Sequence, residues 1–160
     1  MQKTKILNLK GNFYTIVSNK ENNRDLFVFF DWLFDDNKFE TWDSDAVRKY
    51  TEKVKQLFIG YKIKYDYLNK MSFNNKTTGK TLAFQKTNGS FSKELIRHIR
   101  NGFAHNKVWL ISRNRNLYIK IIDVNSYKNN QTAFIYSEYN KIIELYKIYI
   151  LNNIERRKIW

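Results

Sequence analysis

The segment IRHIRNGFAHNKVW, residues 96–109, joins a helical pattern to a run of strand-forming residues and contains both histidines of the chain. On an ideal helix, which advances about 100° per residue, apolar side chains share one face: Leu95, Ile96, Ile99 and Phe103. Polar side chains share the opposite face within roughly 140°: Arg97, Arg100, Asn101 and His105. One side of this helix is therefore expected to pack into a core, while the other displays two guanidinium groups, an amide and an imidazole.

Two residues lie at the border of these faces. Gly102 costs a helix about 1 kcal/mol relative to alanine, so it either lets another backbone approach closely or weakens the helix before Asn106. His98 lies toward the polar side, and we interpret it as a simple exposed residue.

A β-hairpin is predicted after this helix, over residues 107–123. The apolar runs VWLIS and LYIKIID flank the polar tip RNRN, which is typical of two strands joined by a short turn. Arg113 and Arg115 at the tip are candidate substrate-binding residues that would clamp RNA, unless the tip is only a solvated turn. Trp109 and Tyr118 would either stack on bases or belong to the core.

Upstream of the opening segment, the periodicity of apolar residues predicts one helix and one loop. From Asp43 or Ser44, both good N-cap residues, apolar residues recur at steps of three and four, which predicts a helix over 44–71. Residues 72–91 are dominated by Asn, Thr, Gly and Ser and are predicted to form a long loop. The helix that carries the opening segment is predicted to begin at Ser92.

Two further helices are predicted toward the ends of the chain. The segment 12–34 suits a buried helix or a strand, and we favour the helix. Ser137 is predicted to cap a last helix with one apolar stripe. We therefore expect a single domain over 1–160 that is mostly α, with three or four helices packed as a bundle and one small β-hairpin.

The charge of the chain favours a polyanionic partner. Its 29 Lys and Arg residues exceed its 15 Asp and Glu residues, which gives a net charge of +14 and makes nucleic acid the first candidate. AT-rich coding DNA would also raise the lysine content, but residues 81–160 alone hold fourteen basic residues against five acidic ones. The chain has no cysteine, which fits a reducing compartment, and no apolar run near the ~20 residues of a membrane span. We expect a cytoplasmic protein without a membrane partner.

Six acidic residues occur within residues 31–45, DWLFDDNKFETWDSD. They would either bind a metal or supply helix-terminal charge and balance lysines, and we favour the second interpretation. The sequence contains no H-E-x-x-H pair, no P-loop and no G-x-S-x-G elbow. We therefore predict no metal site and no cofactor.

The order of Arg100, Asn101 and His105, written RNGFAH, resembles the R-x-x-x-x-H motif of the HEPN superfamily. The resemblance is to small stand-alone prokaryotic members, some carried on plasmids and in defence loci, and it covers about residues 90–112. It implies an antiparallel, HEPN-like helical bundle that dimerises with its motif helices facing each other. For many members it also implies metal-independent cleavage of RNA. His105 has the motif spacing, whereas His98 does not.

The resemblance assigns the catalytic positions to Arg100, Asn101 and His105. Attack of an RNA 2′-hydroxyl on the neighbouring phosphorus benefits from a base, an acid and positive charge on the phosphorane. Two copies of His105, one from each chain of a dimer, would supply the base and the acid, and Arg100 would hold the phosphate. Asn101 would orient the His105 ring or contact phosphate, and Arg97 would extend the cationic face for substrate binding.

We therefore expect a homodimeric endoribonuclease, either the toxin of a toxin–antitoxin pair or an abortive-infection effector in phage defence. A neutralising antitoxin would then be its protein partner. The alternative is a non-catalytic HEPN module that binds RNA or a partner protein through the same face. A basic DNA-binding regulator is a third interpretation, but no second helix occurs at helix-turn-helix spacing.

Overall fold

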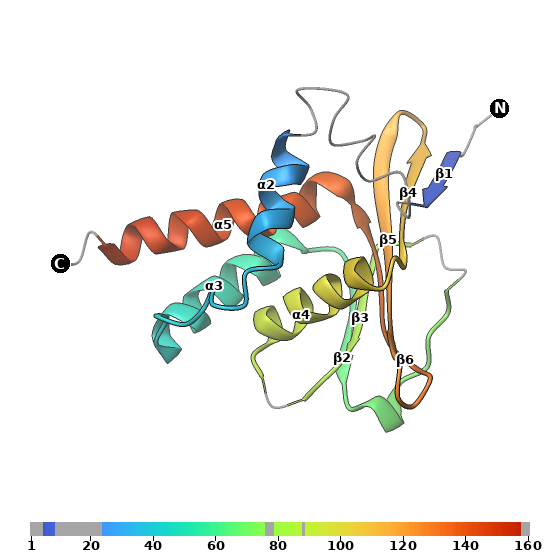
Figure 1. The fold of residues 1–160 in the computed structure, drawn as a ribbon, viewed down its shortest axis with the longest axis horizontal. Coiled ribbons are helices and arrows are strands. Elements are labelled where there is room, and N and C mark those ends of the chain that lie inside the picture. The colour runs from blue at the N-terminus through green and yellow to red at the C-terminus, as the bar shows by residue number, and fades with distance from the viewer. Residues whose placement is uncertain (1–4, 9–23, 76–78, 88, 158–160) are drawn as a thin grey trace.

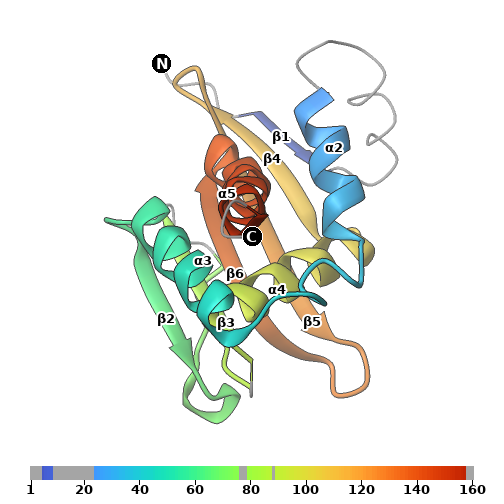
Figure 2. The same ribbon diagram turned by 90° about the vertical axis from the view of Figure 1, so that its left-hand side faces the viewer.

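The computed structural model describes residues 5–8, 24–75, 79–87 and 89–157, and within them the chain forms a six-stranded sheet with four α-helices. The helices lie on one side of the sheet (Figure 1), and Figure 2 views the molecule from that side. The expected mostly α, HEPN-like helical bundle is therefore wrong. Strands form within the segments 44–71 and 72–91, which the local patterns assign to a helix and a loop. These strands pair with partners that are distant in the sequence.

The sheet has the strand order β1-β4-β5-β6-β3-β2. Its strands are β1 (Lys5–Asn8), β2 (Lys62–Asp66), β3 (Thr81–Gln85), β4 (Val108–Arg113), β5 (Asn116–Asn125) and β6 (Asn130–Glu138). β2 and β3 run parallel, whereas every other neighbouring pair is antiparallel. β4, β5 and β6 follow one another as two hairpins, so the middle of the sheet is built from consecutive chain.

The helical layer contains α2 (Arg24–Leu33), α3 (Ser44–Leu57), α4 (Phe91–Ala104) and α5 (Tyr139–Arg157), and a short 3-10 helix, η2 (Leu68–Lys70), follows β2. Each α-helix buries one face. In α3, for example, residues spaced by four are buried: Ala46, Tyr50 and Val54. Among the described helices, each is too short or too polar to cross a bilayer.

The helix predicted over 44–71 is confirmed only in its first half. It begins as expected, because the side chain of Asp43 accepts a hydrogen bond from the amide of Ala46 at 2.8 Å. It ends at Leu57, and Gly60 then adopts a φ of 87°, a left-handed conformation that glycine tolerates and that turns the chain toward β2. The apolar residues beyond this point also fit the alternation of a strand, and pairing with β3 selects the strand.

The loop predicted over 72–91 is wrong in its middle, where β3 forms. This strand lies between β2 and β6, so both of its edges are paired, and four of its five residues are buried. A five-residue strand has a weak local signal, whereas pairing with two neighbours stabilises it. The following helix, expected from Ser92, begins at Phe91 with Ser90 as its N-cap.

β6 is another strand that was not predicted from the sequence. Ser137 belongs to β6 and does not cap the last helix, which begins at Tyr139. The hydroxyl of Ser137 is instead buried, 3.1 Å from that of Tyr61. The helix favoured over 12–34 is confirmed as α2 from residue 24 onward, while residues 12–23 lie outside the described residues.

The hairpin predicted over 107–123 is confirmed as the β4–β5 pair, although it belongs to a larger sheet. At its tip, Asn114 and Arg115 have φ angles of 53° and 66°. Two central residues with positive φ form a two-residue turn whose twist matches that of the paired strands. The polar tip RNRN therefore reverses the chain tightly.

Helix α4 packs its apolar face against the sheet and approaches β5 closely. Leu95 and Ile99 on this face are fully buried, as the helical pattern predicts. A Cβ atom added at Gly102 would lie 2.3 Å from Cγ2 of Ile121 and 3.2 Å from the backbone oxygen of Ile122. Of the two interpretations of Gly102, close approach of another backbone is therefore confirmed.

We expect Gly102→Ala to destabilise the protein by about 1–3 kcal/mol, the usual cost of overpacking a filled core. The added methyl group would push α4 away from Ile121, and this cost exceeds the gain of about 1 kcal/mol that alanine normally brings to a helix. Urea unfolding followed by circular dichroism measures the difference. Lys93→Ala, an exposed change on the same helix, is the control and should cost only about 0.5 kcal/mol, because it removes an exposed cation–π contact with Phe39. A Gly102→Ala protein as stable as its parent would contradict the close packing.

Candidate active site

His105 lies at the C-terminal end of α4, where backbone hydrogen bonds fix its position. The amide of Asn106 donates to the carbonyl of Phe103 at 3.1 Å, and the amide of Lys107 donates to that of Gly102 at 2.8 Å. Asn106 has a φ of 58°. This is the Schellman arrangement, which ends a helix with a left-handed residue, a conformation that asparagine adopts more readily than most residues. His105 is thus exposed at a defined end of the helix.

A small polar cavity of about 190 Å³ lies beside the C-terminal half of α4. Three of the predicted polar residues of α4 line it: Arg97, Asn101 and His105. Because these residues are spaced by four, they lie along one edge of the helix. The rest of the wall comes from β3, β6 and the end of β5 with its following turn: Gln85, Thr132, Asp123, Val124, Asn125 and Ser126.

Asp123 and His98 form a buried, hydrogen-bonded pair that joins β5 to α4. Nδ1–H of His98 donates to Oδ2 of Asp123 at 2.8 Å, and neither side chain is more than 5% exposed. The side-chain amide of Asn101 donates to the same carboxylate oxygen at 3.2 Å. The carboxylate therefore fixes two side chains of α4 relative to the sheet. The interpretation of His98 as an exposed residue is wrong.

Asp123 lies opposite an irregularity in β6. Asp123 pairs with Ala133 and Val124 pairs with Gln131, so Thr132 of β6 is the extra residue of a β-bulge. Such bulges re-aim side chains and are frequent beside active sites. Burial alone would raise the pKa of Asp123, but the hydrogen bond and charge of His98, together with the hydrogen bond from Asn101, hold that pKa below its usual value. Asp123 is therefore a buried carboxylate, not a neutral acid, at physiological pH.

A second carboxylate, Glu94, orients Arg97. Two guanidinium nitrogens of Arg97, NH2 and Nε, lie 2.6 Å and 3.2 Å from Oε2 of Glu94. The other carboxylate oxygen accepts hydrogen bonds from the hydroxyl of Thr87 and the amide of Gly89. Burial opposes ionisation of Glu94, but the hydrogen bonds from Thr87 and Arg97 outweigh it and hold the pKa of Glu94 below its usual value. The guanidinium of Arg97 is thus held at the rim of the cavity.

His98, which contacts Asp123 through Nδ1, contacts Arg97 through its second ring nitrogen, Nε2. Nε2 lies 3.2 Å from NH2 of Arg97 and 3.2 Å from the backbone carbonyl of Gln85. While Nδ1 donates to Asp123, a neutral ring accepts at Nε2 from Arg97, whereas a protonated ring donates at Nε2 to Gln85. Arg97 and Asn101 therefore belong to one continuous network centred on His98.

Arg100, the arginine of the predicted motif, lies outside this cavity. Its NH2 atom is 3.1 Å from Oδ1 of Asp36, and its guanidinium carbon is 5.5 Å from the centre of the Phe34 ring. Its Nε atom is buried and has no hydrogen-bond partner among the described residues. In this structure Arg100 therefore faces the segment after α2 and is separated from His105.

Arg113 and Arg115, the predicted substrate-binding residues of the hairpin, also lie away from the cavity. Arg115 is exposed at the tip and Arg113 ends β4. Residues 116 to 123 of β5 separate the tip from Asp123, a distance on the order of 20 Å at about 3.3 Å per residue. These arginines can therefore contact only a ligand that extends well beyond the cavity.

The acidic segment 31–45 supplies helix-terminal and balancing charge. Asp43 caps α3, and Asp45 pairs with Arg48 at 2.7 Å. The hydrogen bond from Arg48 holds the pKa of Asp45 below its usual value. Across the residues that the structure describes, side chains of His, Asp and Glu do not gather into a group of three that could hold a metal ion.

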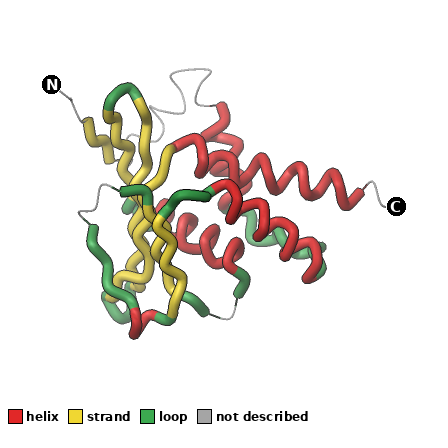
Figure 3. The backbone as a smooth tube through the Cα atoms, turned by 180° about the vertical axis from the view of Figure 1, so that it is seen from behind, coloured by secondary structure: helices red, strands yellow, loops and turns green. Residues whose placement is uncertain are grey.

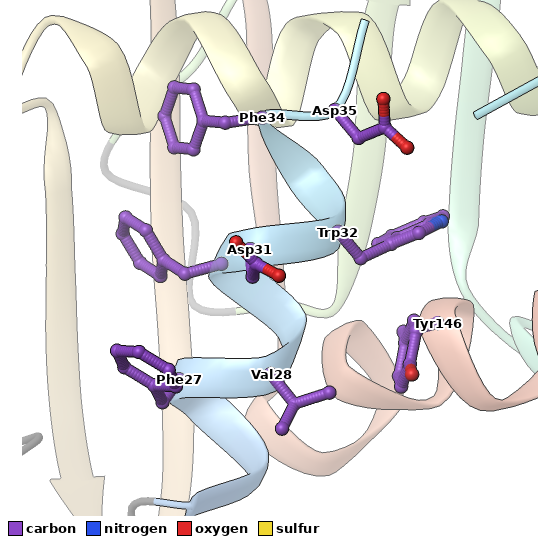
Figure 4. A pocket seen from close by; sticks show the side chains of 8 residues that line it. Phe27, Val28, Asp31, Trp32, Phe34, Asp35 and Tyr146 are labelled. Carbon is purple, nitrogen blue, oxygen red and sulfur yellow. The ribbon is translucent and has the colours of Figure 1, made fainter. Parts of the chain in front are cut away.

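A larger cavity, of about 600 Å³, runs along α2 and has mostly aromatic walls. Figure 4 shows Phe27 and Phe34 on one side of α2 and Trp32 on the other, near Tyr146. The described residues that line this cavity include carboxylates but neither a basic side chain nor an imidazole. It therefore lacks the groups that bind a phosphate, and the polar cavity beside α4 remains the better candidate for an active site.

Two carboxylates of this site, Asp123 and Glu94, were not predicted from the sequence. A signal for Asp123 was present, because an acid within an apolar strand such as LYIKIID is stable there only with a buried partner. Glu94 precedes His98 by four positions, so the two share one helix edge. Neither signal identifies the partner, which comes from the packing of α4 on β5.

Comparison with known proteins assigns no family to this chain. No protein-family model, no curated protein and no solved structure matches it.

We expect Asp123→Asn to lower the free energy of unfolding by about 2–3 kcal/mol near neutral pH, because it removes the buried charge that His98 and Asn101 face. The folded-state pKa of Asp123 is depressed, so its charge stabilises the fold fully above the unfolded pKa of about 3.9. That stabilisation is lost as pH falls through the lower, folded-state pKa. The difference between variant and parent should therefore shrink below about pH 4, which urea unfolding at a series of pH values measures.

Asp45→Asn is the matched control for this prediction. It makes the same chemical change at a carboxylate whose pKa is also depressed but which lies at the surface. Its unfolding midpoint should stay close to that of the parent. Equal losses of stability in the two variants would contradict the buried pair.

Proposed function

We propose that this protein is a metal-independent endoribonuclease whose active site is the polar cavity beside α4. The observation that carries the proposal is the grouping of Arg97, Asn101 and His105 along one edge of the helix, next to the buried Asp123. A guanidinium, an amide and an exposed imidazole are suited to binding a phosphate and moving a proton. Asn101 and His105 are also positions that the resemblance of RNGFAH to the HEPN motif assigns to catalysis.

The surroundings of the cavity favour an anionic ligand. Lys107 follows His105 by two positions, and Lys128 follows the cavity residue Ser126 by two positions; both lysines are exposed. The net charge of +14 adds long-range attraction for a polyanion. RNA, which carries both the phosphate and the 2′-hydroxyl nucleophile, is the substrate that these groups can act on without a metal.

The proposed reaction begins at the 2′-hydroxyl beside the scissile phosphate. Neutral His105 takes the proton of this hydroxyl while its oxygen attacks phosphorus, and Arg97 donates hydrogen bonds to the non-bridging oxygens of the phosphorane. The bond from phosphorus to the 5′-oxygen then breaks, and an acid protonates that oxygen. The products are a 2′,3′-cyclic phosphate and a 5′-hydroxyl end.

A second imidazole is needed as the acid. His98 cannot serve, because its ring is buried and held by Asp123 and Arg97. We assign this role to His105 of a second copy of the chain, in a homodimer formed through the motif helices. Asn101 would position the nearby imidazole or the phosphate.

The biological setting of the proposal is a growth-arresting toxin or an abortive-infection effector in the cytoplasm, where RNA is available. A neutralising antitoxin would be its partner. The resemblance to the HEPN motif supports this setting, and induced expression in a bacterial host tests it. The parent should arrest growth and a His105→Ala variant, expressed to the same level, should not.

We expect His105→Ala to slow RNA cleavage by about 10²–10⁴-fold, the usual contribution of a general acid or base. Arg97→Ala should slow cleavage by about 10²-fold, because the phosphorane loses its guanidinium contact. Single-turnover cleavage of end-labelled, single-stranded RNA in a metal chelator measures both rates, and mass spectrometry identifies the cyclic phosphate. Lys49→Ala, an exposed change on α3, is the control and should cleave like the parent.

Arg100→Ala tests whether the motif arginine, which lies outside the cavity, contributes to cleavage. Because Asp36 holds Arg100 away from His105, we expect this variant to lose less than about tenfold in rate, through weaker attraction of RNA. A loss equal to that of His105→Ala would mean that Arg100 enters the site during the reaction. Undiminished cleavage by both the Arg100 and the His105 variants would refute the assignment of the motif.

Mixing experiments test the composite site. When parent and His105→Ala chains are mixed at constant total concentration, cleavage should fall with the square of the parent fraction, because each site needs two intact histidines. A linear fall would show that one chain suffices. As a control, parent chains are mixed with Arg115→Ala chains, which keep Arg97 and His105. Cleavage should then not fall with the square of the parent fraction.

The rival function is a non-catalytic module that binds RNA or a partner protein through the same face. The placement of Arg100 outside the cavity favours it, because the motif arginine then contributes nothing to the chemistry there. RNA binding without cleavage between about pH 5 and about pH 9 would support the rival and refute the enzyme.

A further inference from the structure

The face of the sheet that the helices leave uncovered carries aromatic and basic side chains together. The described helices lie on the other side of the sheet, as the front and rear views agree (Figures 1 and 3). On the uncovered side, Phe73 from the segment between η2 and β3 packs against a small buried cluster: Ile111, Phe134 and Tyr136. This face is separate from the candidate active site, which lies between α4 and the helix side of the sheet.

The register of the strands sets a row of side chains across this face. Residues directly opposite each other in neighbouring strands have Cβ atoms about 5 Å apart. One such row runs from β4 to β2: Trp109, Lys120, Tyr136, Thr81 and Lys62. Aromatic rings and ammonium groups are therefore neighbours over several strands.

Side chains of this row contact one another and the neighbouring Tyr118. Nζ of Lys120 lies 4.5 Å from the centre of the Trp109 ring, in a cation–π contact. Tyr118 stacks on Tyr136, with ring centres 5.5 Å apart and planes inclined by 11°. Trp109 and Tyr118 are half-buried, so their rings are held by the sheet and still reach solvent.

Arg113 extends the positive charge toward the hairpin tip. Residues at alternate positions in a strand share a face, so Arg113 lies on the same side of β4 as Trp109. Burial raises the pKa of Tyr136, and the nearby charge of Arg113 opposes that rise. The buried hydroxyl of Tyr136 has no hydrogen-bond partner among the described residues.

A cavity of about 290 Å³ continues this face at its β2 side. Its walls combine cations with aromatic rings: Lys62, Lys64, Phe73 and Phe134. Glu138, a carboxylate at the end of β6, is paired with Lys80 at 2.8 Å. The face as a whole therefore keeps a surplus of positive charge around its aromatic residues.

We infer that this uncovered face binds single-stranded RNA, with bases stacked on Trp109 and Tyr118 and phosphates held by Lys120, Arg113 and the lysines of β2. Aromatic platforms between cations hold single strands with little sequence preference, because every base has a π-face. A duplex hides those base faces, so it should bind less well. The inference rests on the proposed function in taking RNA as the ligand. It also gives Arg113 a role in binding RNA, although Arg113 lies too far from the cavity to take part in catalysis.

Fluorescence anisotropy with a labelled single-stranded RNA of mixed sequence tests this inference. All proteins carry His105→Ala, so that the RNA stays intact during the measurement. We expect Trp109→Ala and Lys120→Glu each to weaken binding by about tenfold, through loss of base stacking and of phosphate attraction. Lys120→Glu should also reduce the dependence of binding on salt concentration.

Two controls separate binding from folding and from total charge. Lys49→Glu, on the helix side, changes the net charge as Lys120→Glu does and should bind like the parent. Trp109→Phe keeps an aromatic ring at this position and should retain most of the affinity for RNA. The thermal unfolding midpoint of each variant is measured as well. If unfolding caused the weaker binding, the loss of affinity would parallel the fall in that midpoint. An RNA duplex of the same sequence should compete poorly with the single strand.

Unchanged affinity in both Trp109→Ala and Lys120→Glu would overturn the inference, as would equal binding of duplex and single strand. These binding results do not depend on whether the parent protein, which keeps His105, cleaves RNA. If that protein does not cleave RNA but the two surface variants lose binding, the face is an RNA surface and the proposed enzyme function fails. If it cleaves RNA and the surface variants bind normally, the enzyme function stands and this inference fails.

Discussion

The hydrogen bond between His98 and Asp123 is the contact on which the candidate active site depends. Removing a carboxylate from water costs several kcal/mol, and here the donors of His98 and Asn101 offset that cost. Both donors come from α4, whereas the carboxylate belongs to β5, opposite the bulge in β6. The desolvation cost is met only in one arrangement, so the helix and the strand are held in a single register. The close approach at Gly102 enforces the same register by packing.

This buried network also determines which groups face the cavity. Asn101 is held by Asp123, and Arg97 by Glu94 and His98, before any ligand arrives. Donors that are already oriented stabilise developing charge without reorganising during the reaction. His105 differs from them, because its backbone is fixed by the helix end while its side chain is exposed. The site therefore combines rigid donors with one imidazole that can exchange protons with solvent.

Local patterns predicted the elements that are held by contacts near in sequence. The spacing of apolar residues identified α4, and the polar tip identified the β4–β5 hairpin. β3 was missed, because its five residues are stabilised by distant partners, as Thr81 is by Tyr136. The same limit applies to the site. Asn101 and His105 could be grouped from helix geometry alone, whereas Asp123 joins them only through the packing of α4 on β5.

The charge of α4 places a condition on the proposed dimer. Its exposed edge carries Lys93, Arg97 and His105, of which Arg97 is paired with the buried carboxylate of Glu94. Two copies of this edge facing each other would bring like charges together, and that repulsion weakens only with salt or with an anion between them. An RNA strand supplies such an anion. In a dimer of this kind the substrate would be part of the interface, and the second imidazole would reach the scissile phosphate because RNA has drawn the two helices together.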